Sequence, residues 1–556
     1  MLPRTDVLII HHKEDVKMKK RMLALTLCLM LVLAAMPALS LADEGEKREL
    51  NITAVKVATV EDYETNDFTL WLEDKTGIHI NFNQIPDDSA SEKVAMQFAG
   101  GDLPDAFLGV GLSSDALLQY GSAGAIVALD DYLEQYTPNL MKAMEYYEQG
   151  LSLIKQADGH IYSLPSINPC YHCTYANKMW VNTVWLDNLG LTAPTTTDEF
   201  TEMLKAFRDQ DANGNGDPSD EVPMAGSTNG WYGQTYPYLI NSFLYFDTSK
   251  YGFQLDDEQQ VYNAMAKDEF REALKYLNML YEEGLMYEGT LTQTMDQLKQ
   301  MVENPDGNLV GCMTAGYGGQ FASEIGDERY REYYAISPLK GPEGVQYAMS
   351  ALQLPSIGQF VVTSACADPT LALEWADYFY TSEVTASMYN GIEGVGWRWA
   401  EDGEIGFNGE PAQWAAVAYY SGNTGDTQNY CWTQTGIYNF SAEWRGSQAV
   451  SAEVDLRSAE DMEYMLFKVT QEMYEPYGGL KYNLPTLNYT EDQQSRITDL
   501  TYEFQNYYDE VIYGFITGEK DIDSDADWQA HLDNLATYGV DEICEIYQTA
   551  YDAMYK

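Results

Sequence analysis

The segment from residue 211 to residue 221, DANGNGDPSDE, carries oxygen-bearing side chains at alternating positions. Gly214 and Gly216 stand between them and allow the chain to curl tightly. Ca²⁺ takes about six to eight oxygen ligands at short range, and the first half of this segment matches the start of an EF-hand loop. The pattern therefore predicts a calcium-binding loop. Its candidate ligands are Asp211, Asn213, Asn215, Asp217, Asp220 and Glu221.

The second half of this loop departs from the EF-hand pattern. Val222 stands at position twelve, where an EF-hand carries a bidentate Glu, and the acidic residues come earlier, at 220 and 221. We therefore expect a shortened loop that holds a structural Ca²⁺. Because Asn and Gly also favour turns without any metal, an ordinary turn is the alternative interpretation.

A second cluster of chemically versatile residues is Cys170-Tyr-His-Cys173. A zinc ribbon needs a second CxxC pair, and the sequence has none. A redox motif is conceivable, but the surrounding pattern does not resemble a thioredoxin-like unit. Buried thiols or a local disulfide are the favoured interpretations.

Motifs for catalysis are absent from the sequence. It contains no GxxxxGK[ST] loop, no GxGxxG after a strand, no HExxH and no GxSxG. The histidines after the first 42 residues are not spaced as a metal-binding pair. Acidic residues are so frequent that a two-carboxylate glycoside-cleaving enzyme stays an alternative. The sequence favours a binding protein, without catalytic residues, over an enzyme.

Composition narrows the class of partner. The 556 residues include 45% apolar and 13% aromatic residues, which is typical of a folded chain, and the net charge is −54. Such a surface repels nucleic acid and anionic lipid, which bind clustered Lys and Arg. A neutral solute or a cation is the expected ligand, and nucleic acid is not.

The first 42 residues have the pattern of a signal peptide. A basic stretch follows Met18, which we take as the natural start, and an apolar run then ends in small residues before Ala42. The alternative is an uncleaved membrane anchor. We expect cleavage after Ala42 and export of the remaining chain.

Strand and helix patterns alternate along the chain. Strands are expected at 52–60, 78–83 and 105–110, and helices at 66–75, 89–98, 197–209, 268–283, 369–380 and 492–516. This alternation predicts right-handed strand–helix–strand units and a mainly parallel sheet in an α/β fold.

Aromatic residues recur in glycine-rich stretches after residue 230. Examples are Trp231, Tyr317, Trp397 and Trp399, each next to or near a glycine. Exposed flat rings can stack on the apolar face of a sugar, so they are candidates for carbohydrate binding. Simple packing in the interior is the alternative for each ring.

Several segments together carry a resemblance to a known family. They are WLEDKTGI (71–78), FAGGDLPD (98–105), DGHIYSLP (158–165), WLDNLGL (185–191), PTTTDEF (194–200), GIEG (391–394), FITG (515–518) and Ala550-Tyr551. In this order and spacing the chain resembles the extracellular solute-binding proteins, family 1, that serve sugar importers of the ATP-binding-cassette (ABC) class. It is most similar to the branch with a calcium loop, like the alginate-binding proteins.

The resemblance implies a two-lobed α/β fold of the periplasmic-binding-protein-like type II, with a hinge between the lobes. Residues 43–170 with 345–395 are expected to form lobe I. Residues 171–344 with 396–556 are expected to form lobe II, including the calcium loop. The implied function is capture of an oligosaccharide between the lobes and delivery to the membrane permease of an ABC importer, by a monomer. A receptor for a membrane sensor, a glycoside-active enzyme and a peptide or other solute as ligand are alternatives.

Site residues follow from the topology of this fold, because ligands bind beyond the carboxyl ends of strands. The candidate ligand-binding residues are Tyr63, Asn66, Asp105, Trp231, Tyr317, Glu393, Trp397, Trp399 and Trp432. Two have a structural alternative: Glu393 as a brace for its turn, and Asp105 as an acceptor for backbone N–H groups. In the calcium loop, the family pattern implies side-chain ligation by all candidates except Asp217, which would offer its backbone oxygen.

One departure from the family concerns the cleavage site. Relatives from single-membrane bacteria usually carry a lipid-anchored cysteine there, whereas this chain has Asp43. We expect a periplasmic protein, or one held at the cell surface in another way, or one released.

Overall fold

The computed structural model describes residues 48–323, 328–417, 427–487 and 489–556. The predicted signal peptide lies outside the described residues. Contacts divide the chain into two compact units, and the larger unit comprises Leu50–Thr76 and Ile80–Lys556. Every site discussed below belongs to this larger unit.

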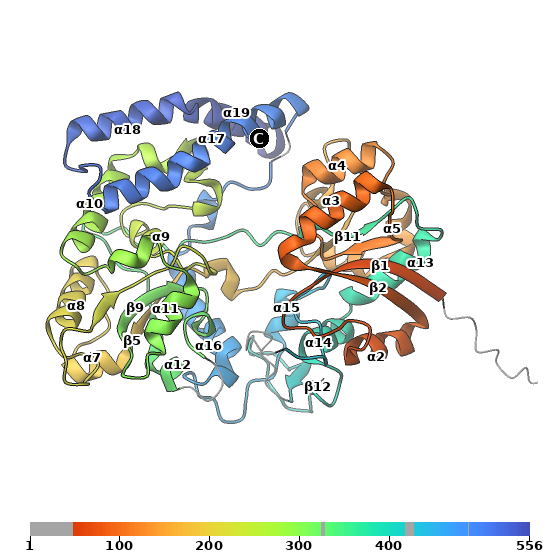
Figure 1. Cartoon of the computed structure of the whole chain (residues 1–556), viewed down its shortest axis with the longest axis horizontal. Coiled ribbons are helices and arrows are strands. Elements are labelled where there is room, and N and C mark those ends of the chain that lie inside the picture. The colour runs from red at the N-terminus through yellow and green to blue at the C-terminus, as the bar shows by residue number, and fades with distance from the viewer. Residues whose placement is uncertain (1–47, 324–327, 418–426, 488) are drawn as a thin grey trace, which may run out of the picture. The chain divides into compact units, whose positions relative to one another are not determined.

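The first sheet has five strands in the order β2-β1-β3-β11-β4 (Figure 1). Their bounds are β2 Ile78–Pro86, β1 Arg48–Lys56, β3 Ala106–Leu108, β11 Ser356–Val362 and β4 Leu164–Ser166. β1 runs parallel to β3, with Ile52 opposite Ala106. β11 runs antiparallel to both β3 and β4.

Helices cover both faces of the first sheet. Successive side chains of a strand point to opposite faces, so two neighbouring residues of β11 contact helices on the two sides. Val361 of β11 packs with Val94 of α3 (Ala90–Gly100) and Leu117 of α4 (Ser114–Ser122). The next side chain, Phe360, contacts Trp375 of α13 (Pro369–Asp377), with ring centroids 5.8 Å apart. The sheet is therefore the middle layer of an α/β/α arrangement.

The second sheet has four strands in the order β10-β5-β9-β6. Their bounds are β10 Tyr333–Ile336, β5 Lys178–Asn182, β9 Val310–Ala315 and β6 Val222–Met224. β5 is antiparallel to β10 and β9, whereas β6 is parallel to β9. Gly311 of β9 leaves room for two rings, Trp185 of α7 (Thr183–Leu189) and Phe207 of α8 (Thr197–Asp209), which meet edge to face.

The C-terminal part of the chain is helical. α16 (Met462–Val469) and α17 (Glu491–Ile516) precede α18 (Asp525–Thr537) and α19 (Val540–Tyr555). α17 contacts α10 (Asp268–Glu282), and α19 contacts both α17 and α18 (Figure 1). Buried residues of these helices and of the second sheet belong to one hydrophobic cluster.

The remaining elements are short. The helices are α2 (Asp67–Thr76), α5 (Asp130–Tyr136), α6 (Pro138–Met144), α9 (Tyr236–Ile240), α11 (Met295–Val302), α12 (Glu328–Glu332), α14 (Ser382–Asn390) and α15 (Ala442–Gly446). Two antiparallel pairs complete the strands: β7 (Phe253–Leu255) with β8 (Val261–Asn263), and β12 (Trp397–Trp399) with β13 (Trp414–Ala416).

Most predicted elements appear within a few residues of their expected bounds, and α8 has the predicted range. The predicted parallel arrangement is confirmed for β1 and β3, but neither sheet is parallel throughout. Both sheets are mixed, because β11 and β5 each run against their neighbours in the middle of a sheet. A strand reached through a long connection can enter a sheet in either direction, and residue patterns do not record that direction.

Residues 428–432 make contacts that bear on the predicted lobe boundary. Asn66 donates its Nδ2 to the carbonyl of Cys431 at 3.1 Å, and the Trp432 ring meets Phe68 edge to face. Both partners lie in the range predicted for lobe I, whereas the prediction places residues 396–556 in lobe II. The strands of the two sheets do fall in the ranges predicted for lobes I and II respectively, and the boundaries themselves stay a prediction.

Among the described residues, no helix combines the length and the apolar character needed to cross a membrane.

Candidate functional site

A cavity of about 530 Å³ is lined by aromatic side chains and by hydrogen-bonding side chains. The aromatic ones are Trp231, Tyr232, Tyr317 and Tyr389. The polar and charged ones are Thr59, Asn168, His172, Gln353, Thr433, Gln434, Thr435, Arg445 and Glu463. This combination suits a ligand that has both flat apolar faces and many hydroxyl groups.

Two parallel strands of the second sheet position the aromatic side of the cavity. Trp231 follows β6 and Tyr317 follows β9, and the two strands are hydrogen-bonded neighbours. The carboxyl ends of parallel neighbours meet at one edge of the sheet, which brings the two rings to a centroid separation of 6.4 Å. Trp231 is 38% exposed, so its ring is open to a ligand. Sequence reasoning predicted both residues.

The backbone around Trp231 is held by Gln320. Its side-chain oxygen accepts from the backbone N–H of Trp231 at 2.7 Å, and its amide nitrogen donates to the Trp231 carbonyl at 3.0 Å. The Trp231 ring lies over Gly316, where an added Cβ would come within 1.9 Å of it. Gly316 is therefore required for this position of the ring.

An ion pair forms the polar side of the cavity. Nη1 of Arg445, which lies in α15, is 3.3 Å from the carboxylate of Glu463 in α16, and Nη2 donates to Oδ1 of Asn168 at 3.1 Å. The Nε of Arg445 is buried and has no hydrogen-bond partner among the described residues. The pair offers carboxylate acceptors and guanidinium donors to hydroxyl groups.

His172 lies behind this ion pair. Its Nδ1 is 3.7 Å from Oε2 of Glu463, and burial lowers the pKa of His172 to about 4. Burial alone would raise the pKa of Glu463, but the charge and the hydrogen bonds of Arg445 outweigh burial, and the pKa lies below its ordinary value. At neutral pH the site therefore contains a charged Arg–Glu pair and a neutral imidazole.

A short 3₁₀ helix, His172–Tyr175, presents His172 and Cys173 to the cavity. The buried Lys178 supports it by donating Nζ to the carbonyls of His172 at 3.1 Å and Tyr175 at 2.5 Å. Burial lowers the pKa of Lys178 to about 7.

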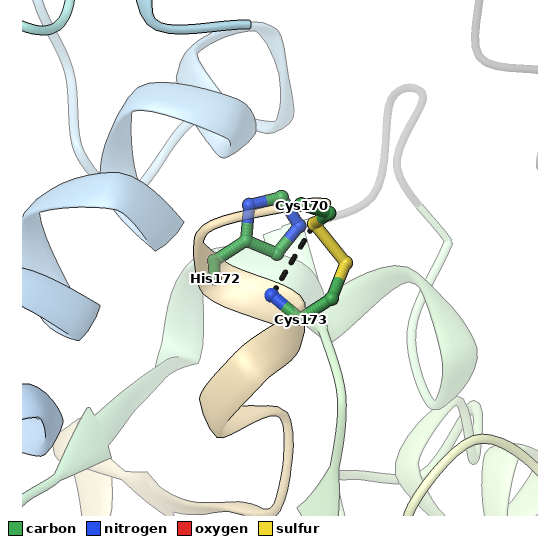
Figure 2. A group of neighbouring side chains, drawn as sticks. All are labelled: Cys170, His172 and Cys173. Atoms are coloured by element: carbon green, nitrogen blue, oxygen red, sulfur yellow. Dashed lines mark hydrogen bonds between the residues drawn. A yellow bond between two sulfur atoms is a disulfide. The ribbon is translucent and has the colours of Figure 1, made fainter. Parts of the chain in front are cut away.

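Cys170 and Cys173 form a disulfide at the start of this helix (Figure 2). This confirms the local disulfide that was one of the two favoured interpretations of the CxxC sequence. Each sulfur is bonded to the other, so neither is available as a thiolate ligand in this oxidised state.

Two predicted ligand-binding residues lie in the interior instead of at the cavity. Tyr63 is fully buried, and its hydroxyl donates to the Val55 carbonyl at 3.0 Å. Asn66 is also fully buried; it accepts from the Phe68 backbone N–H at 3.1 Å and donates to the carbonyl of Cys431. These bonds satisfy both side chains within the protein.

The predicted tryptophans after residue 390 do not line this cavity. Trp397 is buried and donates Nε1 to Ser387 at 3.1 Å, and Trp432 is buried and donates Nε1 to Thr69 at 2.8 Å. Both follow the packing alternative. Trp399 is 45% exposed but lies outside the cavity lining.

The two predicted carboxylates lie outside the cavity lining as well. Oδ2 of Asp105 accepts from the backbone N–H of Asn51 at 2.7 Å and from its side-chain amide at 3.0 Å. Glu393 is exposed in the turn before β12 and forms a β-bridge with Trp397. The arrangement of Asp105 agrees with its structural alternative, and the brace suggested for Glu393 stays a prediction.

Sequence reasoning missed Arg445, Glu463 and Asn168. Arg445 was detectable in part, because basic residues are scarce in this chain and this one follows Trp444 in a Ser-capped helix. Glu463 is one of many acidic residues and Asn168 one of many amides, so neither carries a distinguishing pattern.

The predicted calcium loop joins α8 to β6 and is closed by its own side chains. Nδ2 of Asn213 donates to Oδ1 of Asp220 at 3.0 Å, and Nδ2 of Asn215 donates to Oδ2 at 2.7 Å. The backbone at Gly214 and Gly216 has φ of 75° and 96°, a left-handed conformation that suits glycine. The loop therefore has the tight curl that the sequence predicts.

Two carboxylate oxygens of this loop are left without a partner. Oδ1 of Asp211 and Oε2 of Glu221 are buried, and no donor among the described residues reaches either atom. Their sister oxygens accept backbone N–H groups, from Gly216 at 3.1 Å and from Ala212 at 2.9 Å. Burial raises the pKa of Glu221. Buried carboxylate oxygens without donors fit a hard cation.

Asp217 behaves differently from the other acidic residues of the loop. Its Oδ1 accepts from the backbone N–H of Ser219 at 3.1 Å and from its hydroxyl at 2.6 Å. Its side chain is thus engaged in a local turn, and ligation through its backbone oxygen stays a prediction.

Comparison with known proteins gives a family match and relatives. The family model described as bacterial extracellular solute-binding protein matches residues 56–386. The fructooligosaccharide ABC transporter substrate-binding protein FusA of Streptococcus pneumoniae is 34% identical over 221 residues, which are 39% of this chain and 40% of FusA. The aligned region thus spans less than half of that relative's length.

Solved structures agree over most of the chain. One is an EF-hand mutant of FusA from S. pneumoniae in complex with fructo-nystose, with a TM-score of 0.76 and 21% identity over 91% of this chain and 99% of that one. Another is an HMO-binding solute-binding protein from Bifidobacterium longum infantis, with a TM-score of 0.73 and 20% identity over 91% and 99%. These similarities establish the two-lobed α/β fold. The chain belongs to the bacterial extracellular solute-binding protein family.

Proposed function

We propose that this protein is an exported receptor that captures an oligosaccharide and delivers it to an ABC importer. The observation that carries this proposal is the cavity that is lined both by the neighbouring rings of Trp231 and Tyr317 and by the Arg445–Glu463 pair. A sugar ring has an apolar face that packs on Trp231 and hydroxyl groups that pair with charged acceptors and donors.

The relatives support this class of ligand. FusA is named as a fructooligosaccharide-binding protein, and its structure contains fructo-nystose. The B. longum protein is named as HMO-binding. A neutral oligosaccharide also suits a chain with a net charge of −54, because a polyanion would be repelled.

An enzyme that cleaves glycosides is less well supported. Retaining and inverting mechanisms both need two carboxyl groups that flank the bond to be cleaved. Among the described residues lining the cavity, Glu463 is the single carboxylate, and it is paired with Arg445. A pair of this kind binds hydroxyl groups without supplying the protonated acid that hydrolysis requires.

Delivery would follow closure of the two lobes over the ligand. A ligand that binds the closed state more tightly than the open state shifts the population toward the closed state. A membrane permease can then distinguish loaded from empty protein. The same closed form would serve a membrane sensor, which stays the alternative partner. Export to the periplasm or the cell surface, and action as a monomer, belong to this proposal.

A structural Ca²⁺ in the 211–221 loop is the second part of the proposal. The unpartnered oxygens of Asp211 and Glu221 support it, and Asn213, Asn215, Asp220 and the backbone oxygen of Asp217 would complete the ligand set. Bound there, the cation would neutralise the clustered carboxylates and hold the loop between α8 and β6. FusA has an EF-hand that was the target of mutation.

One experiment separates receptor from enzyme. The protein is incubated with neutral fructooligosaccharides, and the mixture is analysed both for bound sugar, by equilibrium dialysis, and for shortened products, by chromatography. A receptor retains the sugar and yields no product. Release of shorter sugars that depends on Glu463 would overturn the proposal in favour of an enzyme.

A further inference from the structure

The segment Cys170–Cys173 brings three metal-ligating side chains to the wall of the cavity. The two sulfur atoms and a ring nitrogen of His172 all lie within 4.8 Å of one another (Figure 2). Cys170 is fully buried, whereas Cys173 is partly exposed and lines the cavity together with His172. The proposed sugar-binding function uses neither sulfur.

We infer that reduction of the Cys170–Cys173 disulfide converts this segment into a binding site for a thiophilic divalent cation such as Zn²⁺. The ligands are the sulfurs of Cys170 and Cys173 and the imidazole of His172. Thiolate and imidazole are the ligands that zinc prefers in proteins, and a fourth position is left for water.

A dithiol can supply the two electrons of the reducing step; in the experiment below a phosphine supplies them and becomes the phosphine oxide. One thiolate of the reductant attacks the accessible Sγ of Cys173, and Cys170 leaves as a thiolate. The second thiol of the reductant then displaces Cys173 and closes the reductant's own disulfide. Two electrons pass from the dithiol to the two cysteines, and the two thiol protons are released when the cation binds.

The oxidised structure already holds a contact that a metal-bound thiolate would use. The backbone N–H of Cys173 points at Sγ of Cys170 from 3.2 Å (Figure 2). A hydrogen bond of this kind favours a charged sulfur, both as a leaving group and as a ligand. The local turn therefore does not have to be rebuilt after reduction.

The fourth position of a tetrahedral site is left to water. Oε2 of Glu463 lies 3.7 Å from Nδ1 of His172, the ring nitrogen turned away from the sulfurs (Figure 2), and can orient the imidazole from that side. The carbonyls of His172 and Tyr175 are held by Lys178, which fixes the backbone that carries the ligands.

Co²⁺ is the probe that tests this inference, because thiolate-bound cobalt has an intense charge-transfer band in the near ultraviolet. The full protein is reduced with a phosphine, freed of reductant without air and titrated with Co²⁺, and then with Zn²⁺ as competitor. Reduced protein is expected to develop the band at one equivalent and to lose it to Zn²⁺. Oxidised protein is expected to show no band.

Variants locate the site. Cys170→Ser is expected to abolish the band, and His172→Gln is expected to weaken Co²⁺ binding more than about tenfold while thiolate character remains. Cys544→Ser is the matched control, because Cys544 is a partly exposed free cysteine elsewhere, and it should leave the titration unchanged. Circular dichroism of the reduced protein and of each variant establishes that it is folded.

Two results would overturn the inference. The first is a folded, reduced protein without a thiolate-to-cobalt band. The second is a band that persists undiminished in Cys170→Ser, which would assign it to other cysteines. Co²⁺ that is bound by oxygen ligands alone, for example in the calcium loop, produces no such band. If this is the only binding observed, the inference is contradicted.

Discussion

Trp231 is the residue on which the proposed sugar contact depends most. Among the described residues that line the cavity it is the one tryptophan, it is 38% exposed, and Gln320 and Gly316 hold its backbone and ring in place. Stacking on a sugar would remove on the order of 100 Å² of apolar surface from water, which contributes about 2.5 kcal/mol.

Replacement of Trp231 by Ala should therefore weaken oligosaccharide binding by about 30- to 100-fold, because each 1.4 kcal/mol corresponds to about tenfold in Kd. Isothermal titration calorimetry with a neutral fructooligosaccharide measures the change. Trp399→Ala is the control: Trp399 is 45% exposed, against 38% for Trp231, but does not line the cavity, and its loss should leave Kd unchanged. If both substitutions changed Kd by the same factor, the assignment of Trp231 to the sugar-binding site would be contradicted.

Glu221 carries the second prediction at this scale. Its Oε2 is buried without a partner, and burial raises its pKa, so the carboxylate is costly unless a cation binds it. Addition of Ca²⁺ to the chelator-treated wild type should stabilise the folded state by about 2.7 kcal/mol at a hundredfold excess over Kd. The melting temperature should rise accordingly. Glu221→Gln should lose most of this response.

Asp306→Asn provides the control for the calcium experiment. Asp306 is an exposed acidic residue in the 304–307 turn, whose Gly307 lies next to Asn215, but it is not a candidate ligand. This variant should respond to Ca²⁺ like the wild type. If the wild type itself does not respond, the 211–221 loop is an ordinary turn.

Among the elements, those with a strong local pattern were predictable. α8 has buried residues at helical spacing, Thr196 as its cap and acidic residues in its first turn, and it appears over the predicted range. Trp231 and Tyr317 were predictable because each is an aromatic residue beside glycines; that each follows a strand of one sheet is a finding of the structure.

Contacts between residues distant in sequence were not predictable. The sequence predicts that Trp432 is an exposed aromatic residue of a loop. Its ring instead packs on Phe68, more than three hundred residues earlier. Arg445 and Glu463 become a site only because α15 and α16 place them 3.3 Å apart. The direction of β11 and β5 likewise depends on the path of the whole chain.

α18 carries a buried histidine that links stability to pH. His531 is 2% exposed; its Nε2 is 2.9 Å from the Met265 carbonyl, which can only accept, and its Nδ1 is 2.8 Å from the Tyr507 hydroxyl. The neutral tautomer with a proton on Nε2 satisfies both contacts. Burial lowers the pKa of His531 to about 4.

The sign of the effect follows from this shift. Between pH 6.5 and pH 4 the unfolded chain binds a proton that folded His531 does not, so stability falls as the pH falls through this range. The contribution is at most about 3 kcal/mol. Urea unfolding at several pH values should show that His531→Gln loses less stability than the wild type between pH 7 and pH 4.

Gln529→Ala serves as the reference for α18, since Gln529 is exposed on the same helix. Its difference in unfolding free energy from the wild type should stay constant over this pH range. A constant difference for His531→Gln as well would contradict the proposed protonation.

At the scale of the whole molecule, the fold and the charge point to the same kind of partner. The chain has the two-lobed fold of bacterial extracellular solute-binding proteins. Its net charge of −54 disfavours anionic macromolecules as partners. The cavity draws residues from both the N-terminal and the C-terminal parts of the chain, from Val57 to Leu466, so ligand binding should stabilise the folded chain as a unit.

A calorimetric titration of the protein with neutral fructooligosaccharides of increasing length tests the central claim most directly. We predict saturable binding of one oligosaccharide per chain, with a rise in melting temperature and no cleavage of the sugar. The absence of both heat and a melting shift with every oligosaccharide would contradict the assignment of the cavity as a sugar-binding site.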